Sequence, residues 1–312
     1  MKEIIRQRAL EMGFSACGFA AARPLDRLRD FYRHFLEEER QATMAYLQRY
    51  APERLNPEML LTGVKTVIAV LVNYYPTVLL PEEDNFILSK YAPGKRYPPY
   101  IKNKMEPLLG MISGLGENVH SKSYVDSGPV LEKAWAQRCG VGWQGKHTIL
   151  INRPGGSYFY IGIILTTLEL EPDLPETDHC GSCTRCMDAC PTGAIDRPYQ
   201  LDIRSCITYC TNVKNAPMPE EVRQNLKGRI YGCDICQDAC PYNRFAKPTA
   251  DTHFHPNPGL VNMRRSDWTR LSREKFDELF AGTSVAESGY ERLMRNIGFA
   301  GDGGGDYPFV PQ

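Results

Sequence analysis

The stretch Cys180–Pro191 reads CGSCTRCMDACP, and Cys233–Pro241 repeats the pattern of its last nine residues as CDICQDACP. The first run has the spacing C-x2-C-x2-C-x3-C-P, with which bacterial ferredoxins bind [4Fe–4S] clusters. The second run lacks an opening cysteine, and Cys206 can supply that ligand from upstream. Because a cube needs four thiolates and the cysteine before proline turns to the other cube, the sequence predicts two clusters. The expected ligands are Cys180, Cys183, Cys186 and Cys240 for one cluster, and Cys190, Cys206, Cys233 and Cys236 for the other.

Structural zinc is the alternative for these cysteines, because zinc sites also use C-x2-C pairs. Eight thiolates in two runs that both end in C-x3-C-P favour iron–sulfur clusters over zinc. The chain has 11 cysteines, and the remaining three are expected to be structural thiols: Cys17, Cys139 and Cys210.

Composition limits the class of protein. The chain has 312 residues, 42% of them hydrophobic, and 37 basic residues balance 37 acidic ones. A net charge of zero means that a polyanionic partner must meet a local basic patch. The cysteine usage suits a reducing compartment. The N-terminal sequence shows no signal peptide or membrane span, so we expect a cytoplasmic protein without a membrane partner.

The pattern of residues predicts mixed α and β structure. Residues 64–72 form a β-branched run typical of a central strand buried on both faces. Residues 147–152 and 157–167 are expected to pair as a hairpin. Helices are expected over 2–13, within 24–50, and over 105–115, 130–139, 273–280 and 288–297. The Gly-rich residues 301–306 are expected to fray.

The acidic segment 169–178 contains two prolines and is interpreted as a linker. It divides the chain into an N-terminal α/β domain over 1–170, a cluster module over 171–265 and a short helical extension over 266–312.

Residues 90–104 form a basic stretch with five positive charges, no acid and three tyrosines. Basic residues interleaved with aromatic ones can bind phosphates and stack bases. An ordinary solvated loop explains the same composition equally well, so both interpretations stay open.

Electrons relayed by the clusters need an acceptor in the first 170 residues. No Rossmann-type Gly-x-Gly-x-x-Gly run, which would follow a predicted strand and open a helix, and no P-loop occurs in the sequence, so the familiar nucleotide sites are not indicated. The cobalamin motif Asp-x-His-x-x-Gly is also absent, since residues 251–256 fail at its last position. A corrinoid would therefore bind base-off, without a histidine from that motif.

Asp126 follows a predicted strand and precedes a predicted helix. A carboxyl group at such a place can act as a general acid in a cleft, or can cap the helix. Gly142 and Gly145 would let backbone N–H groups approach a bulky ligand.

Three motifs together resemble one family. Residues 126–135 read DSGPVLEKAW, residues 142–146 read GWQGK, and the two cysteine runs follow. In this order the motifs closely resemble the epoxyqueuosine reductase family, cobalamin-dependent iron–sulfur enzymes of tRNA queuosine biosynthesis. The resemblance extends from the first helix to about Asn296. Many members add HEAT-type repeats that help to hold the tRNA, and that module is expected to be short or missing here.

The resemblance implies a corrinoid-binding α/β domain like that of reductive dehalogenases, fused to a ferredoxin-like two-cluster module. It implies reduction of epoxyqueuosine to queuosine at the tRNA wobble position by cob(I)alamin, which the clusters reduce, with Asp126 as proton donor. An external low-potential donor would reduce the clusters, and the chain is expected to be monomeric.

The resemblance also indicates binding residues. The expected corrinoid contacts, besides Asp126, are Arg49, Ser89, Gln144, Gly145, Lys146, Leu150, Ile161, Thr208, Cys233 and Asp234. The candidates for RNA contacts are Lys95, Arg96, Lys214, Arg223, Lys227 and Arg229.

Two alternatives remain. A cytosolic reductive dehalogenase-like enzyme would use the same cofactors, but such enzymes usually carry an export signal. A non-catalytic electron carrier would bind clusters and no corrinoid, and would leave the first 170 residues unexplained.

Overall fold

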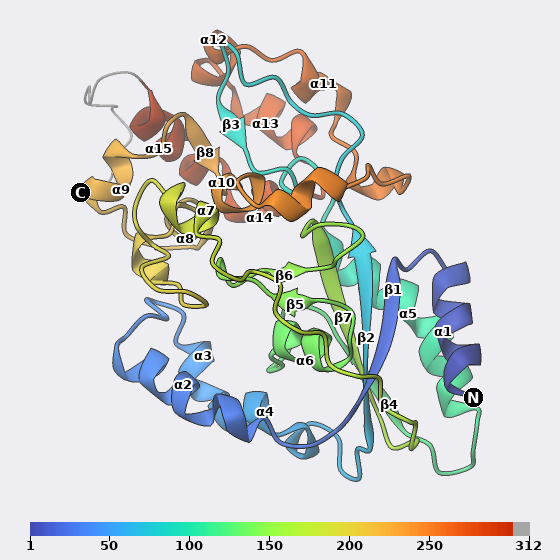
Figure 1. Cartoon of the computed structure of the whole chain (residues 1–312). Helices are drawn as coiled ribbons and strands as arrows, with labels where there is room; N and C mark the ends of the chain where they lie inside the picture. Colours follow the sequence, from blue (N-terminus) through green and yellow to red (C-terminus); the bar gives the residue numbers. More distant parts are fainter. Residues whose placement is uncertain (302–312) are drawn as a thin grey trace. The chain divides into compact units, whose positions relative to one another are not determined.

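The computed structural model describes residues 1–301, and Figure 1 shows the course of the chain. The chain forms two compact units. The first contains residues 1–73, 97–183 and 241–246, and the second contains residues 74–96 and 184–240 and continues from residue 247. No described helix is long and apolar enough to cross a membrane.

A four-stranded antiparallel sheet forms the centre of the first unit. Its order is β1 (Ala16–Ala21), β2 (Thr66–Asn73), β7 (Phe159–Thr166) and β4 (Ser121–Tyr124). The β-branched run predicted as a central strand is β2, and seven of its eight residues are buried. Sheets with both faces covered need such continuous apolar strands, so the prediction is confirmed.

Helices cover both faces of this sheet. On one face α6 (Glu132–Arg138) packs its Trp135 against Val67, Ala69 and Leu71 of β2. Elsewhere α5 (Tyr97–Ser113) contacts β4 and β7, and a side chain at Gly162 would meet the Met105 sulfur at 2.6 Å. The unit also contains α1 (Lys2–Glu11), α2 (Asp26–Glu37), α3 (Tyr46–Arg49), α4 (Ala51–Leu55) and a 3-10 turn over Pro57–Met59.

Two expectations about this unit are wrong. The expected hairpin does not form, because β6 (Leu150–Ile151) pairs with β5 (Trp143–Gln144), whereas β7 pairs with β2 and β4. Sequence pattern shows where strands lie but not which partner each finds. The basic stretch is also not one loop, since α5 begins at Tyr97 and takes in its second half.

The second unit is built around the parallel pair β3 (Ile87–Leu88) and β8 (Arg229–Tyr231). Phe86, which directly precedes β3, packs with Trp268, Phe276 and Phe280 of the C-terminal segment. Asn85 fixes this packing, because its carbonyl accepts a 2.6 Å hydrogen bond from the Trp268 indole. The C-terminal helices therefore share one core with residues 74–96.

The remaining helices of the second unit are short. They are α7 (Arg185–Asp188), α8 (Ile207–Asn212), α9 (Glu220–Gln224), α10 (Ile235–Asp238), α11 (Pro258–Val261), α12 (Arg265–Thr269), α13 (Arg273–Leu279), α14 (Ser284–Ser288) and α15 (Tyr290–Ala300). Further 3-10 turns of this unit span Ile203–Ser205 and Thr252–Phe254, whereas the turn over Pro241–Phe245 belongs to the first unit. Ser272 caps α13 as expected. The Gly-rich tail prediction falls on residues 301–306, which lie almost wholly outside the described residues.

These units differ from the three sequential domains that the linker predicted. Residues 74–96 leave the sheet after β2 and join the second unit, since β3 pairs with β8. The expected domain boundaries stay a prediction about which parts of the chain fold independently.

Candidate functional site

Four predicted cluster ligands lie together in the second unit. Cys190 follows α7, Cys206 precedes α8, Cys233 precedes α10 and Cys236 lies within it; α7 and α10 contact each other. Burial raises the pKa of the Cys236 thiol well above its ordinary value. The charges of Cys206, Cys233 and Cys190 raise that pKa further. Four partly buried thiols, three of which act on the fourth, fit the thiolate set of a cube, whose iron would displace their protons.

The described residues do not form a binding site for a single metal ion. No three Cys, His, Asp or Glu side chains of residues 1–301 are arranged to hold one metal ion. The fit to a cluster therefore depends on the mutual influence of these four thiols and on their motif spacing.

The four cysteines predicted to bind the other cluster lie in stretches of sequence that belong to different units. Cys180 and Cys183 belong to the first, and Cys186 and Cys240 belong to the second. Burial raises the pKa of the Cys180 thiol, while the Trp143 indole N–H and the backbone of Lys146 act in the opposite direction. The indole nitrogen is buried and makes no full hydrogen bond within the described part of the chain, so its N–H is available to a sulfur ligand.

Lys146 holds the loop that carries these cysteines. Lys146 is 8% exposed, and its ammonium group donates to the carbonyl oxygens of Gly181 at 2.6 Å and Cys183 at 3.0 Å. Lys146, which was predicted to contact the corrinoid, therefore has a structural role, because it holds the loop that carries Cys180 and Cys183.

We expect Lys146→Met to loosen that loop, because hydrogen bonds from a charged donor contribute roughly 1.5–3 kcal/mol each. Iron release to a chelator should be faster than in the wild type, and iron content after gel filtration should fall. Lys275→Met is the control, since that lysine pairs with the exposed Glu278. Equal iron release from Lys146→Met and wild type would contradict the assigned task.

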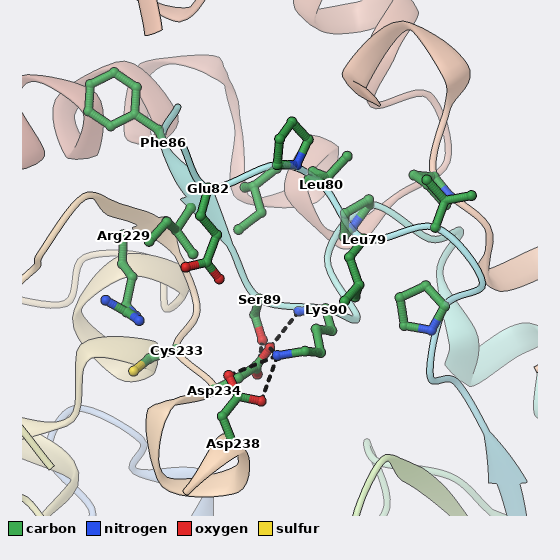
Figure 2. Close-up of a pocket in the computed structure, with 17 residues that line it drawn as sticks. Leu79, Leu80, Glu82, Phe86, Ser89, Lys90, Arg229, Cys233, Asp234 and Asp238 are labelled. Carbon is green, nitrogen blue, oxygen red and sulfur yellow. Dashed lines mark hydrogen bonds and ion pairs between the residues drawn. The ribbon is translucent and has the colours of Figure 1, made fainter. Parts of the chain in front are cut away.

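Three predicted corrinoid contacts, Ser89, Cys233 and Asp234, line one pocket of about 200 Å³ in the second unit (Figure 2). The Ser89 hydroxyl donates a short hydrogen bond to the Asp234 carboxylate, which also accepts from the Lys90 backbone N–H at 2.7 Å. Lys90 reaches on to Asp238 with contacts of 2.6 and 2.8 Å. Apolar side chains of residues 78–80 and Phe86 form the opposite wall.

Arg229 lies on the wall of the same pocket (Figure 2). Its Nε atom is buried without a partner among the described residues, and Nη1 donates to the Lys227 carbonyl at 3.2 Å. Burial raises the pKa of the Cys233 thiol to about 11, and the Arg229 charge acts against that rise. The guanidinium group therefore neighbours a predicted cluster ligand, and Arg229 stays a candidate RNA contact.

Asp126 lies in a tight turn between β4 and α6. Its φ angle is 60°, in the left-handed region that few non-glycine residues adopt, and its side chain is exposed. The capping alternative is wrong, because α6 begins at Glu132, its N-cap residue is Leu131, and no side chain caps it. A strained, exposed carboxyl group fits a functional residue better than a structural one.

Glu132 is a second carboxyl group at this place, and the sequence analysis did not single it out. Its Oε1 atom is buried without a partner in the described part of the chain. Burial raises the pKa of Glu132 to about 7, and the charge of Asp126 raises it further against Arg54 and Lys133. A lone acid within the apolar run VLEKAW was the available signal.

Arg54 and Tyr46 complete this polar group. Arg54 is 6% exposed, donates to the Val130 carbonyl at 3.4 Å, and leaves Nε without a partner among residues 1–301. Its guanidinium carbon lies 5.6 Å from the Tyr46 ring. Burial raises the pKa of Tyr46, as do the charges of Asp126 and Glu132. These four residues form what we call the acid cluster: Tyr46, Arg54, Asp126 and Glu132.

The glycines of the β5–β6 hairpin have a packing reason within the hairpin, and their expected role beside a ligand stays a prediction. A Cβ atom on Gly142 would lie 2.4 Å from the Ile151 carbonyl oxygen, and one on Gly145 would lie 2.6 Å from Ile151 Cδ1. The space that each glycine leaves is therefore filled by the hairpin itself.

Of the other predicted corrinoid contacts, Gln144 and Leu150 lie opposite each other in the β5–β6 pair. Leu150 is buried, Gln144 and Ile161 are half-buried, and Arg49 is exposed at the end of α3; all are in the first unit. Thr208 is half-buried in α8 of the second.

The RNA candidates differ in their availability. Arg96 pairs with Glu287 at 2.6 Å, and Arg223 pairs with Glu220 at 2.7 Å. Lys95, Lys214 and Lys227 are exposed and have no ion-pair partner among the described residues. These three lysines keep their full charge for a polyanion.

Two family profiles match the chain. The one described as "4Fe-4S double cluster binding domain" covers residues 179–243, which contain all eight predicted cysteine ligands. The one described as "Epoxyqueuosine reductase QueG, DUF1730" covers residues 54–127, from Arg54 to just past Asp126. An epoxyqueuosine reductase of Cellulophaga algicola is 37% identical over 297 residues, or 95% of this chain and 97% of that relative. The chain belongs to the epoxyqueuosine reductase family.

Solved structures of epoxyqueuosine reductases share the fold. One, crystallised with an epoxyqueuosine-modified tRNA-Tyr stem loop, superposes with a TM-score of 0.84 at 31% identity, covering 96% of this chain and 80% of that chain. Another, from Bacillus subtilis, has its catalytic aspartate loop swung out of the active site; its TM-score is 0.83 at 30% identity, with the same coverage. The expected mixed α/β fold class and the double-cluster module of an epoxyqueuosine reductase are thereby confirmed. The individual ligands and contacts stay predictions.

Proposed function

We propose that this protein reduces epoxyqueuosine to queuosine in tRNA. The observation that carries the proposal is similarity along 95% of the chain to a relative of nearly the same length that bears this activity in its name. A family structure that holds the modified stem loop supports tRNA as the substrate. This membership favours tRNA modification over the dehalogenase-like and electron-carrier alternatives.

The clusters would relay single electrons from an external low-potential donor. Cys190, Cys206, Cys233 and Cys236 would hold one cube, and Cys180, Cys183, Cys186 and Cys240 the other. Cobalamin, when bound, supplies a strongly reducing and nucleophilic cobalt centre. Ser89, Cys233 and Asp234 would hold it from the second unit, where they line one pocket. The buried, hydrogen-bonded Asp234 carboxylate offers acceptor oxygens suited to the amides that surround a corrin ring.

Asp126 would donate a proton when the epoxide ring opens. Opening puts negative charge on oxygen, and a positioned acid typically accelerates such a step by roughly 10²–10⁴-fold. Its turn is strained and exposed, and the loop of the catalytic aspartate in the Bacillus subtilis relative can leave the active site. We infer that the turn at Asp126 is the corresponding mobile acid.

Nucleoside mass spectrometry tests the function directly. Reconstituted protein would be incubated anaerobically with epoxyqueuosine-containing tRNA and a strong reductant, with and without cobalamin. Cobalamin-dependent conversion to queuosine supports substrate, cofactor and reaction together. No conversion by protein that retains both clusters and cobalamin would overturn the proposal.

Three lysines should carry part of the tRNA affinity. We expect Lys95→Ala, Lys214→Ala and Lys227→Ala together to weaken binding and to reduce the slope of log Kd against log salt, because each lost phosphate contact releases about one counterion fewer. Filter binding at several salt concentrations measures both effects. Lys275→Ala is the matched control, since Glu278 already neutralises that lysine in the same unit. An unchanged salt slope in the triple variant would refute this surface.

We infer a cytoplasmic location, because the proposed substrate, tRNA, is found there. We also infer a monomer that receives electrons from a separate reductant. Sedimentation in the presence and absence of tRNA tests the oligomeric state.

A further inference from the structure

The proposed reaction consumes two protons. An epoxide, two electrons and two protons yield an alkene and water: the epoxide oxygen takes one proton as the first C–O bond breaks, and a second as it leaves. The electrons end in the new C=C bond. Asp126 carries only one proton at a time. The following inference rests on the proposed function and concerns the source of the second proton.

Glu132 is suited to that task by its place. It starts α6, six residues after Asp126, and the charge of Asp126 acts on it. Its Oε1 atom is buried and has no hydrogen-bond partner within residues 1–301. A buried carboxylate oxygen without a donor disfavours the ionised form, so this carboxyl group holds a proton more firmly than an exposed one.

The groups around Glu132 keep its pKa close to neutral pH. Its pKa is raised to about 7, chiefly by burial, and its own backbone N–H, Arg54 and Lys133 limit the rise. Tyr46 of α3 also faces the pair. The strands that contact α6 bring no charged residue: their sequences are ACGFAA, TVIAVLVN, WQ, LI and FYIGIILT. A group poised in this way can both release a proton and regain one from water.

We propose that Glu132 is the proton reservoir of the active site and recharges Asp126 between the two proton transfers. Asp126 first protonates the epoxide oxygen and becomes a carboxylate. Glu132 then passes its proton to Asp126, directly or through a water molecule. Asp126 protonates the departing oxygen, which leaves as water, and Glu132 regains a proton from solvent. Glu132 touches no reacting atom, so it is a positioning residue that acts through Asp126.

Single-turnover kinetics of pre-reduced enzyme with epoxyqueuosine-containing tRNA provide the test, measured from pH 5.5 to pH 9. The wild-type rate should fall as pH rises through about 7, because Glu132 must be protonated to act. Glu132→Gln should be slower by roughly tenfold or more at low pH and should lose that pH dependence. Glu132→Asp should restore part of the rate and part of its pH dependence. Glu53→Gln is the matched control, since Glu53 also has a buried, unpartnered carboxyl oxygen in the described first unit.

A second measurement needs no substrate. Infrared difference titration should show a protonated carboxyl band that disappears near pH 7 in the wild type and in Glu53→Gln, and is absent in Glu132→Gln. A Glu132 that is already ionised at pH 5.5 would overturn the proposal, and so would wild-type rate and pH profile in Glu132→Gln. A wild type that binds clusters and cobalamin but converts no epoxyqueuosine would overturn the proposed function instead, whatever the infrared result.

Discussion

Asp126→Asn should lower the single-turnover rate by at least about 10²-fold while both clusters and cobalamin stay bound, because the variant cannot donate the first proton. Asparagine is the suitable replacement, since it tolerates the left-handed backbone that a φ of 60° requires. The substitution therefore removes the acid and keeps the turn. Nucleoside mass spectrometry gives the rate, and iron content with the cobalamin absorption spectrum shows that the cofactors remain.

Asp84→Asn is the matched control for this prediction. Asp84 is likewise exposed and has a φ of 49°, but it lies in the second unit. Its variant should turn over as the wild type does. A fully active Asp126→Asn would show that another group protonates the oxygen, and the reservoir proposed for Glu132 would lose its acceptor.

Cys236→Ser should remove one cluster and abolish turnover. Iron would fall from about eight to about four atoms per chain, because a cube that loses one of four thiolate ligands is no longer held firmly. Of the four thiols predicted to bind this cluster, Cys236 is the one on which the other three act, so its loss disrupts the whole set. Iron and sulfide analysis, with electron paramagnetic resonance of the dithionite-reduced protein, would count the clusters that remain.

Cys210→Ser separates ligand loss from damage to the fold. Cys210 is fully buried in α8, and its thiol donates to the Arg204 carbonyl at 3.5 Å. Burial raises its pKa to about 12, as expected for an inert thiol. This variant should keep about eight iron atoms. If Cys236→Ser also kept them, Cys236 would not be a ligand and the division of cysteines between the cubes would need revision.

The two-cluster module was predictable from sequence because the spacing within its cysteine motifs is local. Spacings of two or three residues bring thiolates together within a single turn, and the chain needs no distant contact to show this. The double-cluster profile over 179–243 confirms the prediction at the level of the domain. The β2 strand was predictable for a similar reason, since a continuous apolar run is stable only where both faces are covered.

Sequence by itself thus determined the cluster chemistry, the buried central strand and the family. Tertiary structure decided the rest: β6 pairs with β5, residues 74–96 join the C-terminal core, and Lys146 holds the cysteine loop. It also brought Glu132 and Asp126 into one acid cluster, where burial moves a carboxyl pKa to about 7. Strand partners and burial depend on residues far apart in the chain, and a carboxyl group holds its proton according to what surrounds it, which no local pattern records.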